Sequence, residues 1–162
     1  MNILDKFRYS KDDPSQLNII LKKDPYEKVN NNNSSNLNQL LSTSVKVSKE
    51  IFPNINSAIE NVFERLKIKN NLSFFVTANH FQTQATCSAM PLGDSAEIIL
   101  TSRLIELLND EELQSVIAHE VAHFYYQHAL YPQASNSKSR TEILNLLNFS
   151  RAAEISADRI GF

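Results

Sequence analysis

Residues 115–128 read SVIAHEVAHFYYQH, and this stretch decides how the rest of the chain is interpreted. It places His119 and His123 four residues apart, with Glu120 directly after the first histidine. On a helix, residues four apart lie on one face, so two imidazole nitrogens can reach one zinc ion at about 2.0–2.1 Å each. Glu120 would then lie beside the metal, where a general base acts on water. A plain helix that carries these histidines by coincidence is the competing interpretation.

Residues 109–130, NDEELQSVIAHEVAHFYYQHAL, have the clearest helical pattern in the chain. Asn109 can cap this helix, and Glu112, three residues later, can complete a capping box. On the same helix, His128 would lie about 140° around the axis from His123. We therefore expect His128 to be exposed and to point away from a metal site.

A catalytic zinc site needs a third protein ligand and an open fourth position. The last predicted helix, from about residue 141 onward, contains AAEISAD, in which Glu154 and Asp158 share a face. The small residues around both acids would let two helices approach closely. Glu154 could then bind zinc while Asp158 orients a histidine. The alternative is an exposed acidic face beside Arg151 and Arg159.

Two further residues have metal-binding chemistry but no clear place in such a site. His80 follows a predicted strand, and nothing in the sequence brings it near the two helices. Cys87 is the single cysteine and is interpreted as a small buried apolar residue. One thiol cannot form an internal disulfide, which favours a reducing compartment.

The remaining segments predict an α+β fold with two parts. Residues 1–36 are polar, proline-punctuated and rich in asparagine, so we expect a flexible tail. Residues 37–162 would form the folded domain. Within it, apolar spacing and turn residues predict helices over 37–51, 55–66 and 102–108, strands over 72–78, 82–90 and 96–102, and a turn at 91–95.

Composition limits the classes of function. The 162 residues fit one domain, and 42% of them are hydrophobic, enough for a core. A net charge of −2 and a pI of about 6.1 argue against a nucleic-acid-binding surface. Only two glycines occur, which excludes glycine-rich phosphate loops. No stretch is apolar enough to span a bilayer, and no signal peptide is visible. The sequence therefore predicts a soluble, cytoplasmic protein and leaves its oligomeric state open.

HEVAH followed by EISAD resembles the M48-type gluzincin metallopeptidases, which include the CAAX prenyl proteases and the membrane heat-shock proteases. The segment AEIILTSRLIELLNDEELQSVIAHEVAH is similar to the strand, short helix, acidic cap and metal helix of that family. The resemblance covers about residues 50–162. It implies a zincin-like fold, in which a small mixed or antiparallel sheet packs on an active-site helix and a C-terminal glutamate helix.

The resemblance also implies a role for each matching residue. His119, His123 and Glu154 would bind one zinc ion per chain, and Asp158 would hold one of the histidines by a hydrogen bond. Glu120 would be the catalytic residue in the hydrolysis of peptide bonds by zinc-activated water. A peptide or protein substrate would pair with the strand AEIILT as the edge of the sheet.

Two departures from the family leave alternatives open. Familiar members span membranes and continue with further helices, so we expect a minimal or C-terminally truncated form that lacks the group stabilising the oxyanion. His80 and Arg140 are the candidates for that group. The alternative functions are a zinc-stabilised protein-binding module and an inactive or latent protease homologue. Residues 1–36 could be a pro-segment over the cleft, or a leader with no regulatory role.

Overall fold

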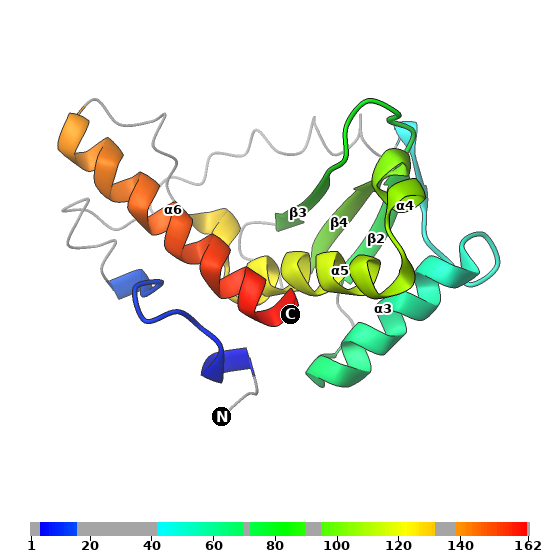
Figure 1. Ribbon diagram of the computed structural model, residues 1–162, viewed down its shortest axis with the longest axis horizontal. Coiled ribbons are helices and arrows are strands. Elements are labelled where there is room, and N and C mark those ends of the chain that lie inside the picture. The colour runs from blue at the N-terminus through cyan, green and yellow to red at the C-terminus, as the bar shows by residue number, and fades with distance from the viewer. Residues whose placement is uncertain (1–3, 16–41, 70–71, 90–94, 132–138, 162) are drawn as a thin grey trace.

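The computed structural model describes residues 4–15, 42–69, 72–89, 95–131 and 139–161. Within these residues a four-stranded mixed sheet is accompanied by helices, so the α+β class predicted from the sequence is confirmed. Figure 1 shows the sheet and helix α3 toward one end of the molecule, the long helix α6 toward the other, and α5 running between them.

The strands are β1 (Ser44–Lys46), β2 (Leu72–Thr77), β3 (Ala85–Ala89) and β4 (Ala96–Thr101). Their order in the sheet is β1-β2-β4-β3. Strands β2 and β4 run parallel, whereas β1 is antiparallel to β2 and β3 is antiparallel to β4. The strands predicted over 72–78, 82–90 and 96–102 are confirmed.

Strand β4 is an interior strand, and the expectation that AEIILT forms an edge of the sheet is wrong. It pairs with β2 on one side and with β3 on the other. Ile98 and Leu100 of β4 are fully buried, as expected for a strand with an almost continuous apolar sequence. Among the described strands, the edge on this side is β3, whose shorter and more polar sequence suits an edge.

The helices are α3 (Pro53–Leu66), α4 (Ser102–Leu107), α5 (Asp110–Tyr125) and α6 (Arg140–Gly161), and the 3₁₀ turns are η1 (Leu4–Lys6) and η2 (His128–Leu130). The helices predicted over 55–66, over 102–108 and from residue 141 are confirmed. Pro53 opens α3, where its fixed φ suits a first helical turn.

The helix predicted over 37–51 is wrong from residue 44 onward, although Ser42 and Thr43 are helical. Residues 44–46 form β1, and the Val47 N–H then donates to the Phe74 carbonyl at 2.8 Å. The apolar residues of this segment have a helical spacing, but its β-branched residues favour a strand over a helix, so pairing with β2 decides the structure. Residues 37–41 and most of the turn predicted at 91–95 lie outside the described residues.

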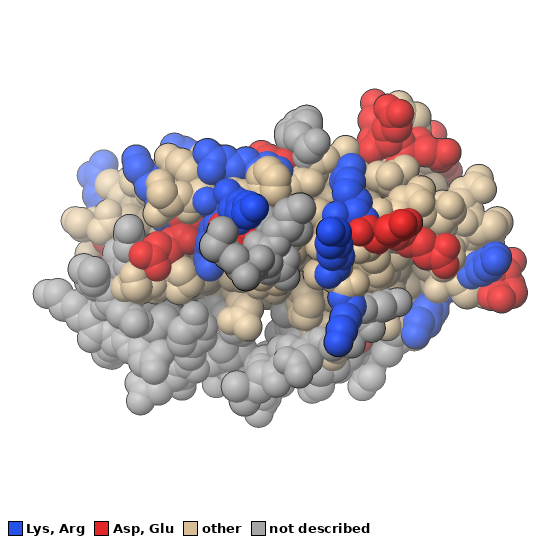
Figure 2. Space-filling model, turned by 90° about the horizontal axis from the view of Figure 1, so that it is seen from below, with Lys and Arg blue, Asp and Glu red and all other residues tan. Residues whose placement is uncertain are grey.

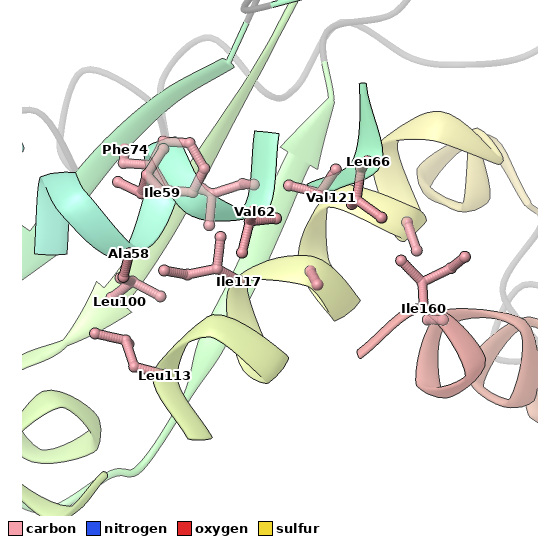
Figure 3. Close-up of a cluster of buried hydrophobic side chains, with 14 of the residues drawn as sticks. Ala58, Ile59, Val62, Leu66, Phe74, Leu100, Leu113, Ile117, Val121 and Ile160 are labelled. Carbon is pink, nitrogen blue, oxygen red and sulfur yellow. The ribbon is translucent and has the colours of Figure 1, made fainter. Parts of the chain in front are cut away.

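The hydrophobic core forms where α5 packs against α3 and the sheet. Figure 3 shows Ile117 of α5 pointing toward Val62 of α3, close to Leu100 of β4. All three side chains are fully buried, and each such burial stabilises the fold by about 1.5–3 kcal/mol. This packing fixes the direction of α5 and therefore the direction in which its polar face points.

Both ends of α5 are set by identifiable contacts. At the start, the Asn109 side chain accepts from the Glu112 N–H at 3.0 Å, and the Glu112 carboxylate accepts from the Asn109 N–H at 2.9 Å. The predicted capping box is therefore confirmed. At the other end, α5 stops at Tyr125 rather than at residue 130, because Gln127 adopts a left-handed conformation with φ 58°.

Helix α6 crosses α5 through small side chains. Ala153, Ser156 and Ala157 of α6 are buried. Near the end of α6, a Cβ built on Gly161 would meet the Ser115 carbonyl oxygen of α5 at 2.8 Å, a contact that only glycine avoids. The close approach expected from these small residues is observed, and it brings the polar faces of the two helices together.

Residues 4–15 are packed against the end of α5 and against α6. Leu4 is fully buried, and its carbonyl oxygen accepts from the Tyr126 hydroxyl at 2.6 Å. Asp12 is only 1% exposed. This part of the expected tail is therefore attached to the folded body. Residues 16–36 lie outside the described residues, so the division of the chain at residue 36 stays a prediction.

Charges of both signs are mixed over the described part of the surface in Figure 2, where Lys and Arg side chains lie beside Asp and Glu. This agrees with the small net charge of −2. None of the helices within the described residues is long and apolar enough to cross a membrane.

Candidate metal centre

Three side chains with metal-binding atoms converge where α5 and α6 cross. His119 and His123 come from α5 and Glu154 from α6, and their donor atoms lie within 4.8 Å of one another. The Nε2 atoms of the two histidines are 3.0 Å apart. Glu154 Oε2 lies 3.4 Å from His119 Nε2 and 3.5 Å from His123 Nε2. The structure thus brings together three residues that the sequence predicted for one site.

These distances fit a single tetrahedral metal ion. Two ligand atoms about 2.0–2.1 Å from zinc, at the tetrahedral angle, lie about 3.4 Å apart. Two imidazole nitrogens with one carboxylate oxygen form a donor set that zinc accepts. The side chains of His119 and His123 are 23% and 17% exposed, whereas that of Glu154 is 55% exposed. The group therefore opens toward solvent and leaves a side free for water or substrate.

Acidic groups surround the two histidines. Hydrogen bonds with His119 and His123 lower the pKa of Glu154 and keep its carboxylate ionised. The hydrogen bond with Glu154 in turn raises the pKa of His119, although burial opposes this shift. Asp158 Oδ1 lies 3.0 Å from His119 Nδ1. Asp158 is therefore placed where it can orient the His119 ring.

Glu120 is the buried acid beside this group, with an exposed fraction of 9%. Burial raises the pKa of its carboxyl group, while the nearby His123 and His119 and a hydrogen bond with the Cys87 backbone act in the opposite direction. That contact holds the carboxyl group between α5 and the edge strand β3. A carboxyl group with a raised pKa exchanges protons more readily near neutral pH.

His128 is buried, and the expectation of an exposed histidine that points away from the site is wrong. It is 9% exposed, and its Nδ1 lies 2.8 Å from His123 Nδ1. The predicted position assumed that α5 continues to residue 130. Because Gln127 is left-handed, the chain turns instead, and η2 carries His128 back to His123. Burial lowers the pKa of His128, which favours the neutral ring.

A cleft of about 640 Å³ lies over the candidate centre. Its lining joins β3, α5, η2 and α6, and includes Gln84, Ala85, Thr86, Cys87, His119, Glu120, His123, Tyr131, Leu147, Phe149 and Glu154. Cys87 is partly buried rather than fully buried. Burial raises the pKa of its thiol to about 12, so the thiol remains protonated.

The two residues proposed from the sequence to stabilise an oxyanion lie elsewhere. His80 Nδ1 faces Glu106 Oε1 at 3.7 Å, and its side chain is 68% exposed. Arg140 is the exposed first residue of α6. Neither belongs to the described lining of the cleft.

Sequence reasoning missed the residues that close the back of the site. Asp12 Oδ2 lies 3.0 Å from His128 Nε2, and the Tyr131 hydroxyl donates to Asp12 Oδ1 at 2.9 Å. Asp12 lies in a polar segment that resembles a tail, so no local pattern marked it. The run of aromatic residues around His128, FYYQHALY, was the one available sign that this histidine is buried.

A group of side chains that could hold a metal ion, beside a buried carboxyl group of raised pKa and under an open cleft, is the combination that metal-dependent hydrolases use. The model of peptidase family M48 matches residues 50–144, which is more than half of the 162 residues. The chain therefore belongs to peptidase family M48, a family of metallopeptidases. None of the curated proteins matches the chain. The matched range includes His119, Glu120 and His123, whereas Glu154 and Asp158 follow it.

Proposed function

We propose that the protein is a zinc-dependent metalloendopeptidase with a zincin-like catalytic unit. The observation that carries this proposal is the convergence of His119, His123 and Glu154 beside the buried Glu120. Membership of peptidase family M48 supports peptide-bond hydrolysis as the reaction.

The proposed ligands are the two histidines and Glu154, with one zinc ion per chain. When bound, zinc supplies a Lewis acid that polarises a carbonyl group and lowers the pKa of water. Glu154 is ionised, as a carboxylate ligand has to be. Asp158 keeps the Nε2 atom of His119 directed toward Glu154 and His123 by its contact with the other ring nitrogen.

Glu120 is the proposed general base and general acid. It takes a proton from the attacking water, whose oxygen forms the new bond to the carbonyl carbon of the peptide. As the carbon–nitrogen bond breaks, Glu120 gives that proton to the leaving amine. The raised pKa of Glu120 supports this role. Burial brings the pKa of its carboxyl group closer to the pKa values of the attacking water and of the leaving amine, the two groups with which it exchanges a proton.

The substrate we propose is an extended peptide that lies along β3. Among the described strands β3 pairs only with β4, and Gln84 to Cys87 line the cleft beside Glu120. An extended chain can add to such an edge through backbone hydrogen bonds. We therefore propose that the substrate pairs with β3, and not with β4 as expected from the sequence.

The test compares the zinc-loaded chain with Glu120→Gln on a generic peptide library, with cleavage read by mass spectrometry. We expect cleavage to fall by about 10²–10⁴-fold, because a proton-transfer group is lost, while zinc content stays unchanged. The matched control is Glu111→Gln, an exposed acid in the first turn of the same helix, which should cleave like the wild type. Equal background cleavage by all three proteins would favour a zinc-stabilised binding module instead.

A further inference from the structure

Both ring nitrogens of His123 are engaged. Its Nε2 lies 3.0 Å from His119 Nε2 and 3.5 Å from Glu154 Oε2, on the side of the candidate metal centre. Its Nδ1 lies 2.8 Å from His128 Nδ1. His119 has the carboxylate of Asp158 at the corresponding nitrogen, whereas His123 has a second imidazole there.

The contact continues through His128 to a buried carboxylate. His128 Nε2 lies 3.0 Å from Asp12 Oδ2, and the two side chains are 5% and 0% exposed. The Tyr131 hydroxyl donates to Asp12 Oδ1 at 2.9 Å, and Arg8 Nε donates to Oδ2 at 3.3 Å. Asp12 is thus fixed at the far end of a row of contacts that starts at His123.

When His123 binds a metal through Nε2, one arrangement of protons makes both the His123–His128 contact and the His128–Asp12 contact hydrogen bonds. Coordination needs the lone pair of Nε2, so the proton of the neutral ring is on Nδ1. That N–H has to donate to His128 Nδ1, which must then be unprotonated. His128 therefore carries its proton on Nε2 and donates it to Asp12, since an ionised carboxylate can only accept.

We propose that Asp12, acting through His128, holds His123 in the tautomer that presents an unprotonated Nε2 to the metal. This inference rests on the proposed function, because it requires a metal ion at His119, His123 and Glu154. Asp12 and His128 are positioning residues, since each acts on the centre through another ring. Part of the metal site would then come from a segment that precedes the matched range of 50–144.

The same segment is attached to both helices that provide the proposed ligands. The Tyr9 N–H donates to Ser156 Oγ of α6 at 2.9 Å, and the Leu4 carbonyl oxygen accepts from Tyr126, directly after α5. These contacts attach the segment in addition to the hydrogen bond that Asp12 accepts from Tyr131. The contact of the Asp12 carboxylate with His128 adds an acceptor that selects which nitrogen of the ring carries the proton.

The experiment has two readouts on the full chain, for the wild type, Asp12→Asn and Asp13→Asn. The first is zinc affinity, measured by competition with a chromophoric chelator. We expect Asp12→Asn to bind zinc about 10–100-fold more weakly, the usual effect of losing the partner of a ligating histidine. Asp13 is the matched control, because its carboxylate accepts from the N–H and the hydroxyl of Ser15, and its replacement should leave the affinity unchanged.

The second readout is the tautomer of each histidine, from long-range ¹H–¹⁵N correlation spectra of ¹⁵N-labelled protein. Four histidines keep the spectrum assignable. In the wild type we expect His128 to be protonated on Nε2 and His123 on Nδ1. In Asp12→Asn the populations of both tautomers should shift. A segment that only anchors the fold would change the thermal stability of Asp12→Asn but not these ring nitrogens.

The outcomes separate this inference from the proposed function. A wild-type spectrum with His128 protonated on Nδ1 overturns the inference even if Asp12→Asn fails to fold. Equal zinc affinity of the wild type and a folded Asp12→Asn also overturns it, while the proposed function stands. A wild type that binds no zinc overturns the proposed function, and the tautomers of the metal-free chains still show whether Asp12 sets the rings of His128 and His123.

Discussion

At the scale of single residues, Asp12 shows how a buried carboxyl group stays ionised. Burial alone would raise its pKa, but hydrogen bonds with His128 and Ser156 and the charges of His128 and Arg8 lower it to about 2. Tyr131 also donates to this carboxylate, and the Arg8 guanidinium donates to both Tyr131 and Asp12. The ionised form is therefore favoured in the folded chain.

This lowered pKa predicts how stability depends on pH. A carboxyl group that titrates at about 2 in the folded chain and near 3.8 when unfolded stabilises the fold fully above pH 3.8. That contribution, about 2 kcal/mol, is lost as the pH falls through 2. Asp12→Asn should therefore lower the free energy of unfolding by about 2 kcal/mol at neutral pH, and the difference from wild type should narrow below pH 4.

Urea unfolding of both proteins over a series of pH values, in the presence of a chelator, measures this difference. The chelator removes any metal, so zinc binding does not contribute to the difference between the two chains. Because Asp12 contacts His128, the titration of His128 also contributes to the difference, and the effect of Asp12 itself is taken from the change below pH 4. A difference that stays constant from pH 7 to about pH 2 would contradict the assignment of a lowered pKa to Asp12.

At the scale of elements, the site depends on how closely α6 lies on α5. Glu154 can reach the two histidines because Ala153 and Ala157, on the buried side of α6, leave little space between the helices. No loop positions Glu154; the spacing of the two helices does. A larger side chain in this contact should therefore affect both the stability of the fold and the metal site.

Ala157→Leu tests that dependence. Ala157 is fully buried, so the added volume should push the helices apart and lower the free energy of unfolding by about 1–3 kcal/mol. Zinc affinity should fall in the same variant, since Glu154 moves with α6. The matched control is Asn145→Leu at an exposed position of α6, where a change within about 0.5 kcal/mol is expected. Unfolding and chelator competition measure both effects, and unchanged zinc affinity in a destabilised Ala157→Leu would refute the link.

Local patterns in the sequence predicted most elements and the three converging side chains. The capping box at Asn109 and the spacing of His119 and His123 are properties of one helix, so neighbouring residues determine them. Glu154 became predictable because small residues and an acid at a fixed spacing mark a helix that packs closely on another.

What the sequence did not predict depends on contacts between distant residues. The interior place of β4 follows from pairing with β3, which no single strand encodes. The position of His128 follows from one left-handed residue, Gln127, that is not a glycine. Asp12 meets His128 across 116 positions of the chain, so its polar surroundings in the sequence gave no sign of burial.

At the scale of the whole molecule, the candidate site is assembled from four parts. Helix α5 and helix α6 hold the three converging donors, β3 borders the cleft, and residues 4–15 support the site through His128. None of residues 4–15 belongs to the described lining of the cleft. Their placement supports a structural contribution to the site rather than the pro-segment role considered from the sequence; residues 16–36 lie outside the described part of the chain.

The most direct test of the central claim is the zinc content of the chain after equilibrium dialysis against zinc, measured by elemental analysis. We predict one zinc per chain for the wild type and for Glu111→Gln. Glu154→Gln, which removes one of three converging donors, should hold clearly less than one at the same free zinc concentration. A wild type without zinc, or a Glu154→Gln variant that binds it as well as the wild type, would contradict the proposed metal centre.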